Sequence, residues 1–158
     1  FEEIIDRVVG GDFEAGLVIH EGQLTFGDSG LHLVVDLGAW WKGETGLPLP
    51  LGGNAIRRDL EDRWGPGTLE ELAMLLRESV AWAMANKDRA VEWAMNWGRG
   101  IDRPTAEKFV DMYVNRWTLD VGPEGREALS AFFDRTHRLG ILPDAGRVDI
   151  VGRPAPAS

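Results

Sequence analysis

The hydrophobic pattern of this chain changes its period near residue 60, and that change constrains the fold more than any other feature. Before it, two short apolar runs rich in β-branched side chains, at residues 14–20 and 31–37, are typical of buried strands. After it, apolar residues recur at the spacing of amphipathic helices. The order of the elements predicts an α/β chain that becomes helix-rich after residue 60.

The first part of the chain also contains a predicted helix and a proline-rich crossover. Residues 1–9 (FEEIIDRVV) place their apolar side chains on one helical face, and the two glycines that follow end the helix. Pro48 and Pro50 exclude a helix further along and favour an extended backbone. We therefore expect residues 49–57 to form an extended crossover.

Four helices are predicted in the second part. The first covers residues 68–86, where Thr68 and Glu71 have the spacing of a capping box. The others cover about residues 88–97, a stretch from Pro104 through Trp117, and a stretch from Pro123 that buries Ala128, Leu129, Phe132 and Phe133. Packing between helices is the expected role of Trp82, Trp93, Trp97 and Trp117. The tail at residues 144–158 is expected to be mobile.

Composition excludes several classes of partner and chemistry. Lysine and arginine number 17 against 26 acidic residues, which gives a net charge of −9, and the basic residues are scattered. Such a balance repels phosphate backbones and anionic lipid surfaces, so neither a nucleic acid nor a membrane is expected as a partner. The chain has no cysteine, which excludes disulfides, thiolate metal sites and cysteine nucleophiles.

His20 has the best position of the three histidines for chemistry. It closes the apolar run at residues 14–20 and opens a glycine-containing loop, and α/β sheets commonly present ligand-binding groups at such strand ends. An unperturbed imidazole, with a pKa of about 6.5, is mostly neutral at pH 7 and can accept a proton. The residues alone leave open a second interpretation, in which His20 is a capping or buried hydrogen-bonded side chain. His32 and His137 are expected to be structural.

Several familiar catalytic motifs are absent from the sequence. His20 and Glu21 begin like the zinc motif H-E-x-x-H, but residue 24 is leucine, and no metal site is predicted. There is no G-x-S-x-G elbow, P-loop or dinucleotide fingerprint. The secondary candidates for substrate binding are Glu21, Asn54 in the crossover, and Arg57, whose guanidinium suits a substrate carboxylate. A solvent-exposed role for Arg57 stays open as well.

Three segments carry a resemblance to a known family. EAGLVIHEGQLTF (14–26), VVDLGAWWKGETGLPLPLGGNAIRRDL (34–60) and YVNRWTLDVGPEG (113–125) together resemble the C-terminal part of the 1,4-dihydroxy-6-naphthoate synthase family. The likeness keeps the same order and extends over residues 1 to about 143. The combination of G-L-V-I-H-E-G with E-T-G-L-P-L-P-L-G is more specific than either motif alone.

The resemblance implies the C-terminal part of a two-lobed fold like that of the type II periplasmic binding proteins. Residues 1–50 would then form part of the smaller, second lobe and carry the I-H-E-G motif. Residues 51–143 would comprise the crossover and the helices that return to the first lobe, whose N-terminal part is absent. This implies either a partner, which would be a separate N-terminal half or a second copy of the chain, or that the sequence is part of a longer protein.

The resemblance also implies an activity. Members of the family are cytoplasmic lyases of menaquinone biosynthesis that convert cyclic dehypoxanthinyl futalosine to 1,4-dihydroxy-6-naphthoate without a metal or redox cofactor. The histidine of the I-H-E-G motif is their base, and the matching residue is His20. Three alternatives stay open: a sister enzyme like chorismate dehydratase, a non-catalytic solute-binding module, and an inactive fragment.

Overall fold

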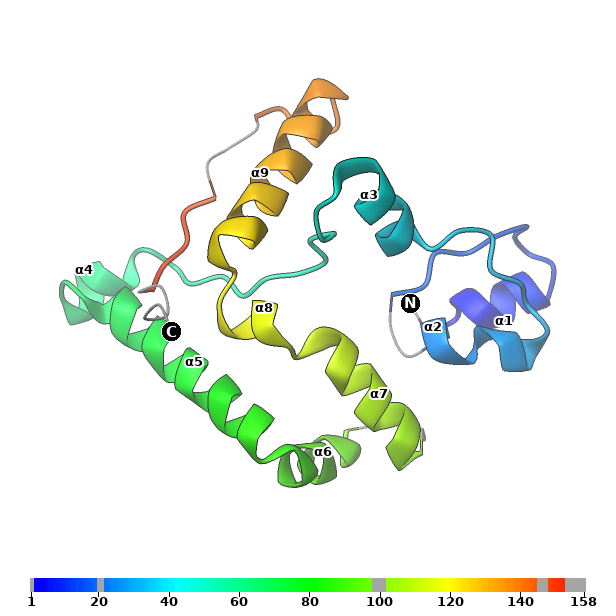
Figure 1. Cartoon of the computed structure of the whole chain (residues 1–158), viewed down its shortest axis with the longest axis horizontal. Coiled ribbons are helices and arrows are strands. Elements are labelled where there is room, and N and C mark those ends of the chain that lie inside the picture. The colour runs from blue at the N-terminus through cyan, green and yellow to red at the C-terminus, as the bar shows by residue number, and fades with distance from the viewer. Residues whose placement is uncertain (1, 20–21, 98–101, 145–147, 153–158) are drawn as a thin grey trace. The chain divides into compact units, whose positions relative to one another are not determined.

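The computed structural model describes residues 2–19, 22–97, 102–144 and 148–152. The regular elements in these ranges are all helical (Figure 1): α1 (Ile4–Val9), α2 (Gly22–Thr25), η1 (Phe26–Ser29), α3 (Leu37–Thr45), α4 (Leu60–Trp64), α5 (Thr68–Ala85), α6 (Lys87–Met95), α7 (Arg103–Tyr113), α8 (Arg116–Leu119) and α9 (Gly122–Arg138). The chain divides into two compact units. Unit 1 contains residues 1–36 and 87–113, and unit 2 contains residues 37–86 and 114–158.

The prediction of a helix-rich chain after residue 60 is confirmed. The predicted helices correspond to α5, α6, α7 and α9, each of which begins within one residue of the expected start, and α1 matches the predicted first helix. Gly11, with φ of +81°, turns the chain out of α1 in the left-handed region that glycine favours. In the part of the chain that is described, no helix is both long and apolar enough to cross a membrane.

The two predicted strands do not form in the described residues. Residues 14–19 and 31–36 contain no helix or strand, so the α/β class expected from their composition is not observed here. A strand exists only through hydrogen bonds to a neighbouring strand, and neither stretch has one. The apolar side chains of the second stretch consequently face solvent, with Leu33, Val34 and Val35 being 64%, 87% and 50% exposed.

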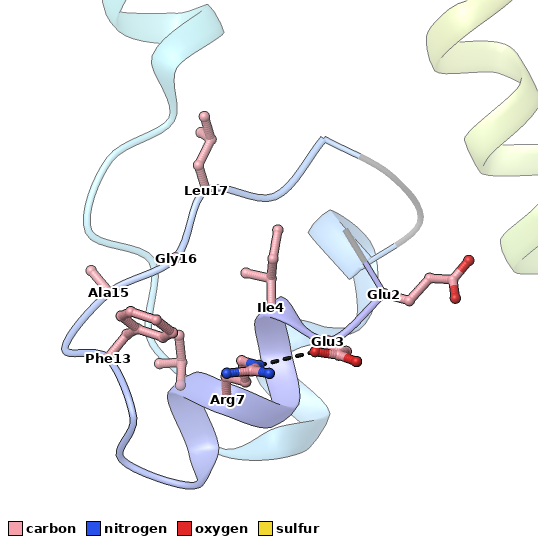
Figure 2. A pocket seen from close by; sticks show the side chains of 9 residues that line it. Glu2, Glu3, Ile4, Arg7, Phe13, Ala15, Gly16 and Leu17 are labelled. Carbon is pink, nitrogen blue, oxygen red and sulfur yellow. Dashed lines mark hydrogen bonds and ion pairs between the residues drawn. The ribbon is translucent and has the colours of Figure 1, made fainter.

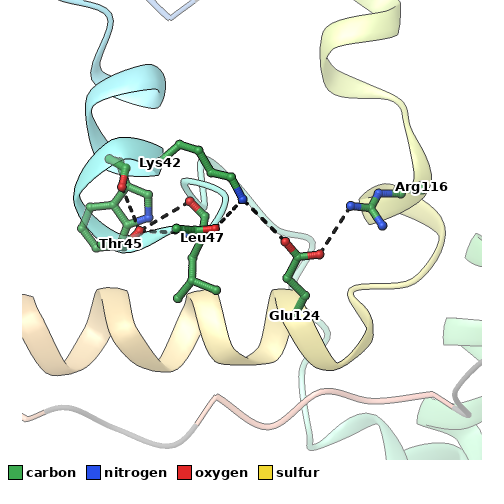
Figure 3. Close-up of polar contacts among 7 residues, drawn as sticks. Lys42, Thr45, Leu47, Arg116 and Glu124 are labelled. Carbon is green, nitrogen blue, oxygen red and sulfur yellow. Dashed lines mark hydrogen bonds and ion pairs between the residues drawn. The ribbon is translucent and has the colours of Figure 1, made fainter.

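Helix α3, at the point where the second strand was expected to end, was not predicted. Its C-terminal end is defined by Thr45, whose hydroxyl donates to the carbonyl of Trp41 at 2.8 Å and accepts from the N–H of Leu47 at 3.1 Å (Figure 3). Gly46 follows with φ of +71°, and Pro48 prevents the helix from continuing. The T-G-L-P part of the second motif is thus a helix stop that leads into the crossover.

The core of unit 2 joins α3 to α9. Trp41 is only 5% exposed and contacts the ring of Phe132 edge-on, with 5.7 Å between centroids, while Ala128 is 2% exposed. At the N-terminal end of α9, Glu124 forms ion pairs with Lys42 at 3.8 Å and with Arg116 at 3.4 Å (Figure 3). Because all three of these charged side chains are about half exposed or more, the apolar contacts carry most of the stabilisation.

Unit 1 is built around the pair of helices α6 and α7. Val91 of α6 is 1% exposed and Ala106 of α7 is 6% exposed, and these small side chains let the two helices approach closely. Two ion pairs cross between the helices: Lys87 with Asp111 at 2.7 Å, and Arg103 with Asp88 at 3.0 Å. These contacts therefore hold α7 in place against α6 within unit 1.

Three local predictions in the helical part are wrong. The N-cap of α5 is Gly67, and the hydroxyl of Thr68 donates backward to the carbonyl of Gly65 at 2.8 Å, so the expected capping box does not form. The third helix ends at Tyr113, and Trp117 belongs to α8, where its N–H is capped by Asn115. Trp82, Trp93 and Trp97 are 51%, 69% and 76% exposed, so the described helices do not pack around them as expected.

The tail has contacts where it is described. Arg58 donates to the carboxylate of Asp149, and a Cβ added at Gly152 would lie 3.4 Å from that of Ala73 in α5. The other tail residues, 145–147 and 153–158, lie outside the described ranges. Mobility of the tail stays a prediction.

Candidate functional site

The leading candidate residue, His20, and its neighbour Glu21 lie outside the described residues. The structure does describe the chain on both sides of them. Ile19 ends the extended segment, and Gly22 is buried and begins α2. The site can therefore be characterised by what holds these two flanks.

The upstream flank is held by two side chains that sequence reasoning did not single out. The hydroxyl of Tyr113 donates a hydrogen bond to the carbonyl oxygen of Ile19. The side-chain amide of Gln23 donates to the same carbonyl at 3.2 Å and to the hydroxyl of Tyr113 at 2.8 Å. The three groups form a closed triangle, in which the carbonyl accepts two hydrogen bonds and the hydroxyl both donates and accepts.

The position of Tyr113 is set by α7. Its ring lies 4.7 Å from that of Phe109, one turn earlier, with the planes tilted by 42°. The cross-helix ion pairs and the buried Val91 described above hold α7 to α6. A contact 94 residues away in the sequence thus restrains the residue that precedes His20. Tyr113 is the chain's single tyrosine, and nothing in its spacing links it to Ile19.

The secondary candidates in unit 2 are in the extended stretch before α4. Asn54 is exposed. The guanidinium of Arg57 is occupied by Asp59, to which Nε donates at 2.8 Å and Nη2 at 2.5 Å. A substrate carboxylate would therefore have to compete with Asp59 for Arg57.

A hollow of about 660 Å³ lies in unit 1 between α1 and the segment at residues 13–17 (Figure 2). Arg7 on its wall pairs with Glu3 at 3.0 Å and lies 3.8 Å from Asp12, so its positive charge is already balanced. The other residues that line the hollow are apolar, apart from Glu2 and Glu3. The hollow therefore offers little to attract an anionic ligand.

The shifted ionisable groups belong to a helix cap and to surface ion pairs. Hydrogen bonds from the hydroxyl and the N–H of Thr105 lower the pKa of Asp102, which precedes α7. A hydrogen bond to Asp149 raises the pKa of Arg58, and one to Glu107 raises the pKa of Arg103. These shifts therefore indicate structural roles. No cluster of three potential metal ligands occurs within the ranges that are described.

Comparisons with known proteins place the chain among relatives. The profile of a family described as menaquinone biosynthesis matches residues 2–138. The 1,4-dihydroxy-6-naphthoate synthase of Thermus thermophilus is 39% identical over 147 residues, which are 93% of this chain and 53% of that protein. The synthase of Streptomyces coelicolor is 36% identical over 146 residues, which are 92% of this chain and 50% of that protein.

A solved structure resembles the chain closely. The crystal structure of a protein from Archaeoglobus fulgidus is 43% identical, with a TM-score of 0.82, over 90% of this chain and 52% of that one. The chain spans about half the length of the curated relatives that it matches. The resemblance noted in the sequence is thereby confirmed.

Proposed function

The chain belongs to the menaquinone biosynthesis family, and from this premise we propose that it supplies the catalytic half of a lyase in which His20 is the general base. The substrate is cyclic dehypoxanthinyl futalosine and the product is 1,4-dihydroxy-6-naphthoate. The observation that carries the proposal is the 39% identity, over 93% of the chain, to a protein named for that synthase activity. The I-H-E-G motif around His20 supports the assignment of the base.

The chemistry needs one group that accepts a proton near neutral pH. Neutral imidazole does so, and a positioned general base typically accelerates a reaction by about 10²–10⁴-fold. Removal of a proton from the cyclised, sugar-bearing ring system allows carbon–carbon cleavage, which releases a sugar-derived fragment and leaves an aromatic product. Aromatisation provides the driving force, and neither a metal nor a redox cofactor takes part.

The proposal includes a partner for the chain. The extended stretches 14–19 and 31–36 become strands of the smaller lobe when an N-terminal half, of the kind that the relatives contain, completes a two-lobed protein. The exposure of Leu33, Val34 and Val35 supports this, because such side chains are ordinarily buried in strands. Residues 51–143 then return to the first lobe, and the pair acts in the cytoplasm.

An assay of the two halves together tests the proposed function. The chain and the N-terminal half are co-expressed, and formation of 1,4-dihydroxy-6-naphthoate is followed by chromatography. His20→Asn is expected to lower kcat by about 10²–10⁴-fold, because the base is lost. His137→Asn is the matched control, since this histidine lies at the end of α9 and its Nδ1 contacts the carbonyl of Leu142.

Other outcomes would contradict the proposal in different ways. Full activity in the His20→Asn variant would exclude this histidine as the base. Turnover of chorismate in place of the futalosine derivative would favour the sister dehydratase, and tight binding without turnover would favour a solute-binding module. Activity of the chain without its partner would contradict the need for a second half.

A further inference from the structure

We propose that residues 148–152 of the tail form a strap that fastens the crossover to α5. The strap has two attachments. Asp149 accepts a hydrogen bond from the guanidinium of Arg58, which follows the crossover, and Gly152 lies against Ala73 of α5. All of these residues belong to unit 2, and Figure 1 shows the strap, in red, where it reaches α5. The inference goes beyond the proposed function and does not depend on it.

The polar contacts of residues 51–59, which lead into α4, are otherwise local. Arg57 pairs with Asp59, and the carbonyl groups of Arg57 and Arg58 accept hydrogen bonds from N–H groups at the start of α4. Residues 51–55 are exposed, and the two glycines among them leave the backbone free to bend. The contact of Arg58 with Asp149, by contrast, joins residues 91 apart in the chain. The tail therefore supplies a long-range restraint on this stretch.

The attachment to α5 depends on small side chains. A Cβ added at Gly152 would lie 3.4 Å from the Cβ of Ala73, which is ordinary van der Waals contact, so the backbone of the tail lies directly on the helix. In the run L-A-M-L-L at residues 72–76, all the other side chains are larger than that of Ala73. Gly152 also has φ of +110°, a conformation that glycine adopts more readily than other residues. The two small residues thus let the tail and α5 approach closely.

The strap combines an ion pair with apolar burial. Ile150 and Val151, between the two attachments, are partly buried. The side chains of Arg58 and Asp149 are 71% and 59% exposed, and ion pairs with such exposure contribute little to stability. We therefore expect the ion pair to select the place where the tail lies, and the apolar side chains to hold it there.

The strap lies outside the residues that the family profile matches, which end at residue 138. Its role therefore does not follow from the resemblance. Composition predicts mobility for the tail as a whole, whereas the contacts of residues 148–152 indicate that this part of it is held.

Deletion of residues 148–158 should free the crossover. Because the chain has no cysteine, a nitroxide label can be attached to the single cysteine of Ala55→Cys, at an exposed residue of the crossover. Electron paramagnetic resonance of the labelled full chain then reports the mobility of that residue. The spectral lines should narrow when the tail is deleted, and unchanged lines overturn the inference.

A charge exchange separates the ion pair from a general loss of folding. Asp149→Arg places a like charge beside Arg58, so the lines of the label should narrow. Amide hydrogen exchange in α4 should become roughly 2- to 5-fold faster, which is the range that the loss of an exposed ion pair allows. Adding Arg58→Asp restores opposite charges and should return both signals to those of the parent. Failure of this second change to restore them contradicts the pairing.

The matched control is Asp144→Arg. It makes the same substitution at an exposed acidic residue of the same tail. The label and the exchange of α4 should both stay as in the parent. Changes as large as those of Asp149→Arg would mean that any added charge in the tail has this effect, and would overturn the inference.

A designed disulfide tests the attachment to α5. The Cβ atoms of Ala73→Cys and Gly152→Cys would lie 3.4 Å apart, close to the separation of about 3.5–4.5 Å that disulfides span. Mild oxidation of the full chain should therefore link them, and mass spectrometry of unreduced peptides detects the link. In the control, Ala81→Cys takes the place of Ala73→Cys about 12 Å further along α5, so no link should form.

The linked form also tests what the strap does. Oxidation should slow amide exchange in α4 below that of the reduced protein, and reduction should reverse the change. No link in the first pair of cysteines, or equal linking in both pairs, overturns the contact of the tail with α5. None of these measurements uses turnover, so each outcome leaves the proposed function unaffected.

Discussion

At the scale of single residues, close approach decides which side chains the structure tolerates. Gly16 lies where the extended segment crosses α1, and a Cβ added there would sit 2.6 Å from Cγ2 of Ile4 and 3.1 Å from Cγ2 of Val8. Glycine at this position therefore lets the segment that leads to His20 lie directly on the first helix. The first glycine of the G-L-V-I-H-E-G motif is therefore explained by close packing against α1, and it also belongs to the motif that carries the resemblance.

Gly16→Ala is expected to destabilise unit 1. Overpacking of this kind typically costs about 1–3 kcal/mol, because the segment or α1 must shift. Thermal unfolding followed by circular dichroism measures the effect. The control is Gly27→Ala, since a Cβ at Gly27 would meet nothing within 4 Å.

A compensating change checks the cause of that loss. Ile4→Ala removes the methyl group that the new Cβ would meet, so the double variant should lose less than the two single effects combined. If the losses of stability in Gly16→Ala and Ile4→Ala were strictly additive, the contact between the added Cβ and Ile4 would not be the cause of the destabilisation.

At the scale of elements, the positions of the later helices were predicted better than the groups that cap them. Gly46 and Pro48 stop α3 as such residues do generally, but α3 itself was missed because its apolar start reads as part of a strand. The spacing of Thr68 and Glu71 predicted the start of α5 correctly, although the capping box that this spacing indicates does not form. Asn115, whose side chain caps α8 together with Thr118, was not recognised.

The start of α7 provides a pH-dependent prediction. Hydrogen bonds from Thr105 lower the pKa of Asp102 below its ordinary value of 3.8. A carboxyl group whose pKa is lower in the folded state stabilises the fold above its unfolded pKa, and that contribution is lost as pH falls through the folded pKa. Asp102→Ala should therefore lower Tm by a few degrees at pH 7, and the difference should shrink below about pH 3.8.

Asp102→Asn is the control for this effect. Its amide oxygen can accept the same hydrogen bond from the N–H of Thr105 without carrying a charge. The Tm difference between Asp102→Asn and Asp102→Ala should accordingly stay constant with pH. A wild-type advantage over Asp102→Ala that persists unchanged in acid would contradict the role of the carboxylate.

At the scale of the whole molecule, exposed apolar side chains support the proposed N-terminal half. Large apolar residues are exposed in the helices and in the extended stretches alike, among them Val34, Leu75 and Trp93. Many exposed large apolar side chains are typical of a surface that contacts another protein segment, and are unusual on a surface that faces only solvent. The relatives, about twice as long, agree with that interpretation.

Addition of the N-terminal half should change the secondary structure of the pair. The circular dichroism spectrum of the complex is expected to contain more strand signal than the sum of its parts, because residues 14–19 and 31–36 gain neighbours. At a partner concentration of 100 times Kd, the chain should also gain about 2.7 kcal/mol of stability.

A single charged substitution tests whether residues 31–36 take part in the association with the N-terminal half. Val34→Lys should weaken association, since it puts an ammonium group where the most exposed of these side chains becomes buried. Ser29→Lys, at an exposed residue of η1, makes the same change of charge and is the control. Equal binding by Val34→Lys and the parent would contradict burial of residues 31–36.

The sequence by itself determined the helices of the second part, the family, and the choice of His20 as a candidate. Helices and their stops follow from local order because each backbone hydrogen bond joins residues four apart. Only the tertiary structure decided that the β-branched runs stay unpaired here and that Tyr113 reaches Ile19, because strand pairing and such contacts depend on groups far away in the chain.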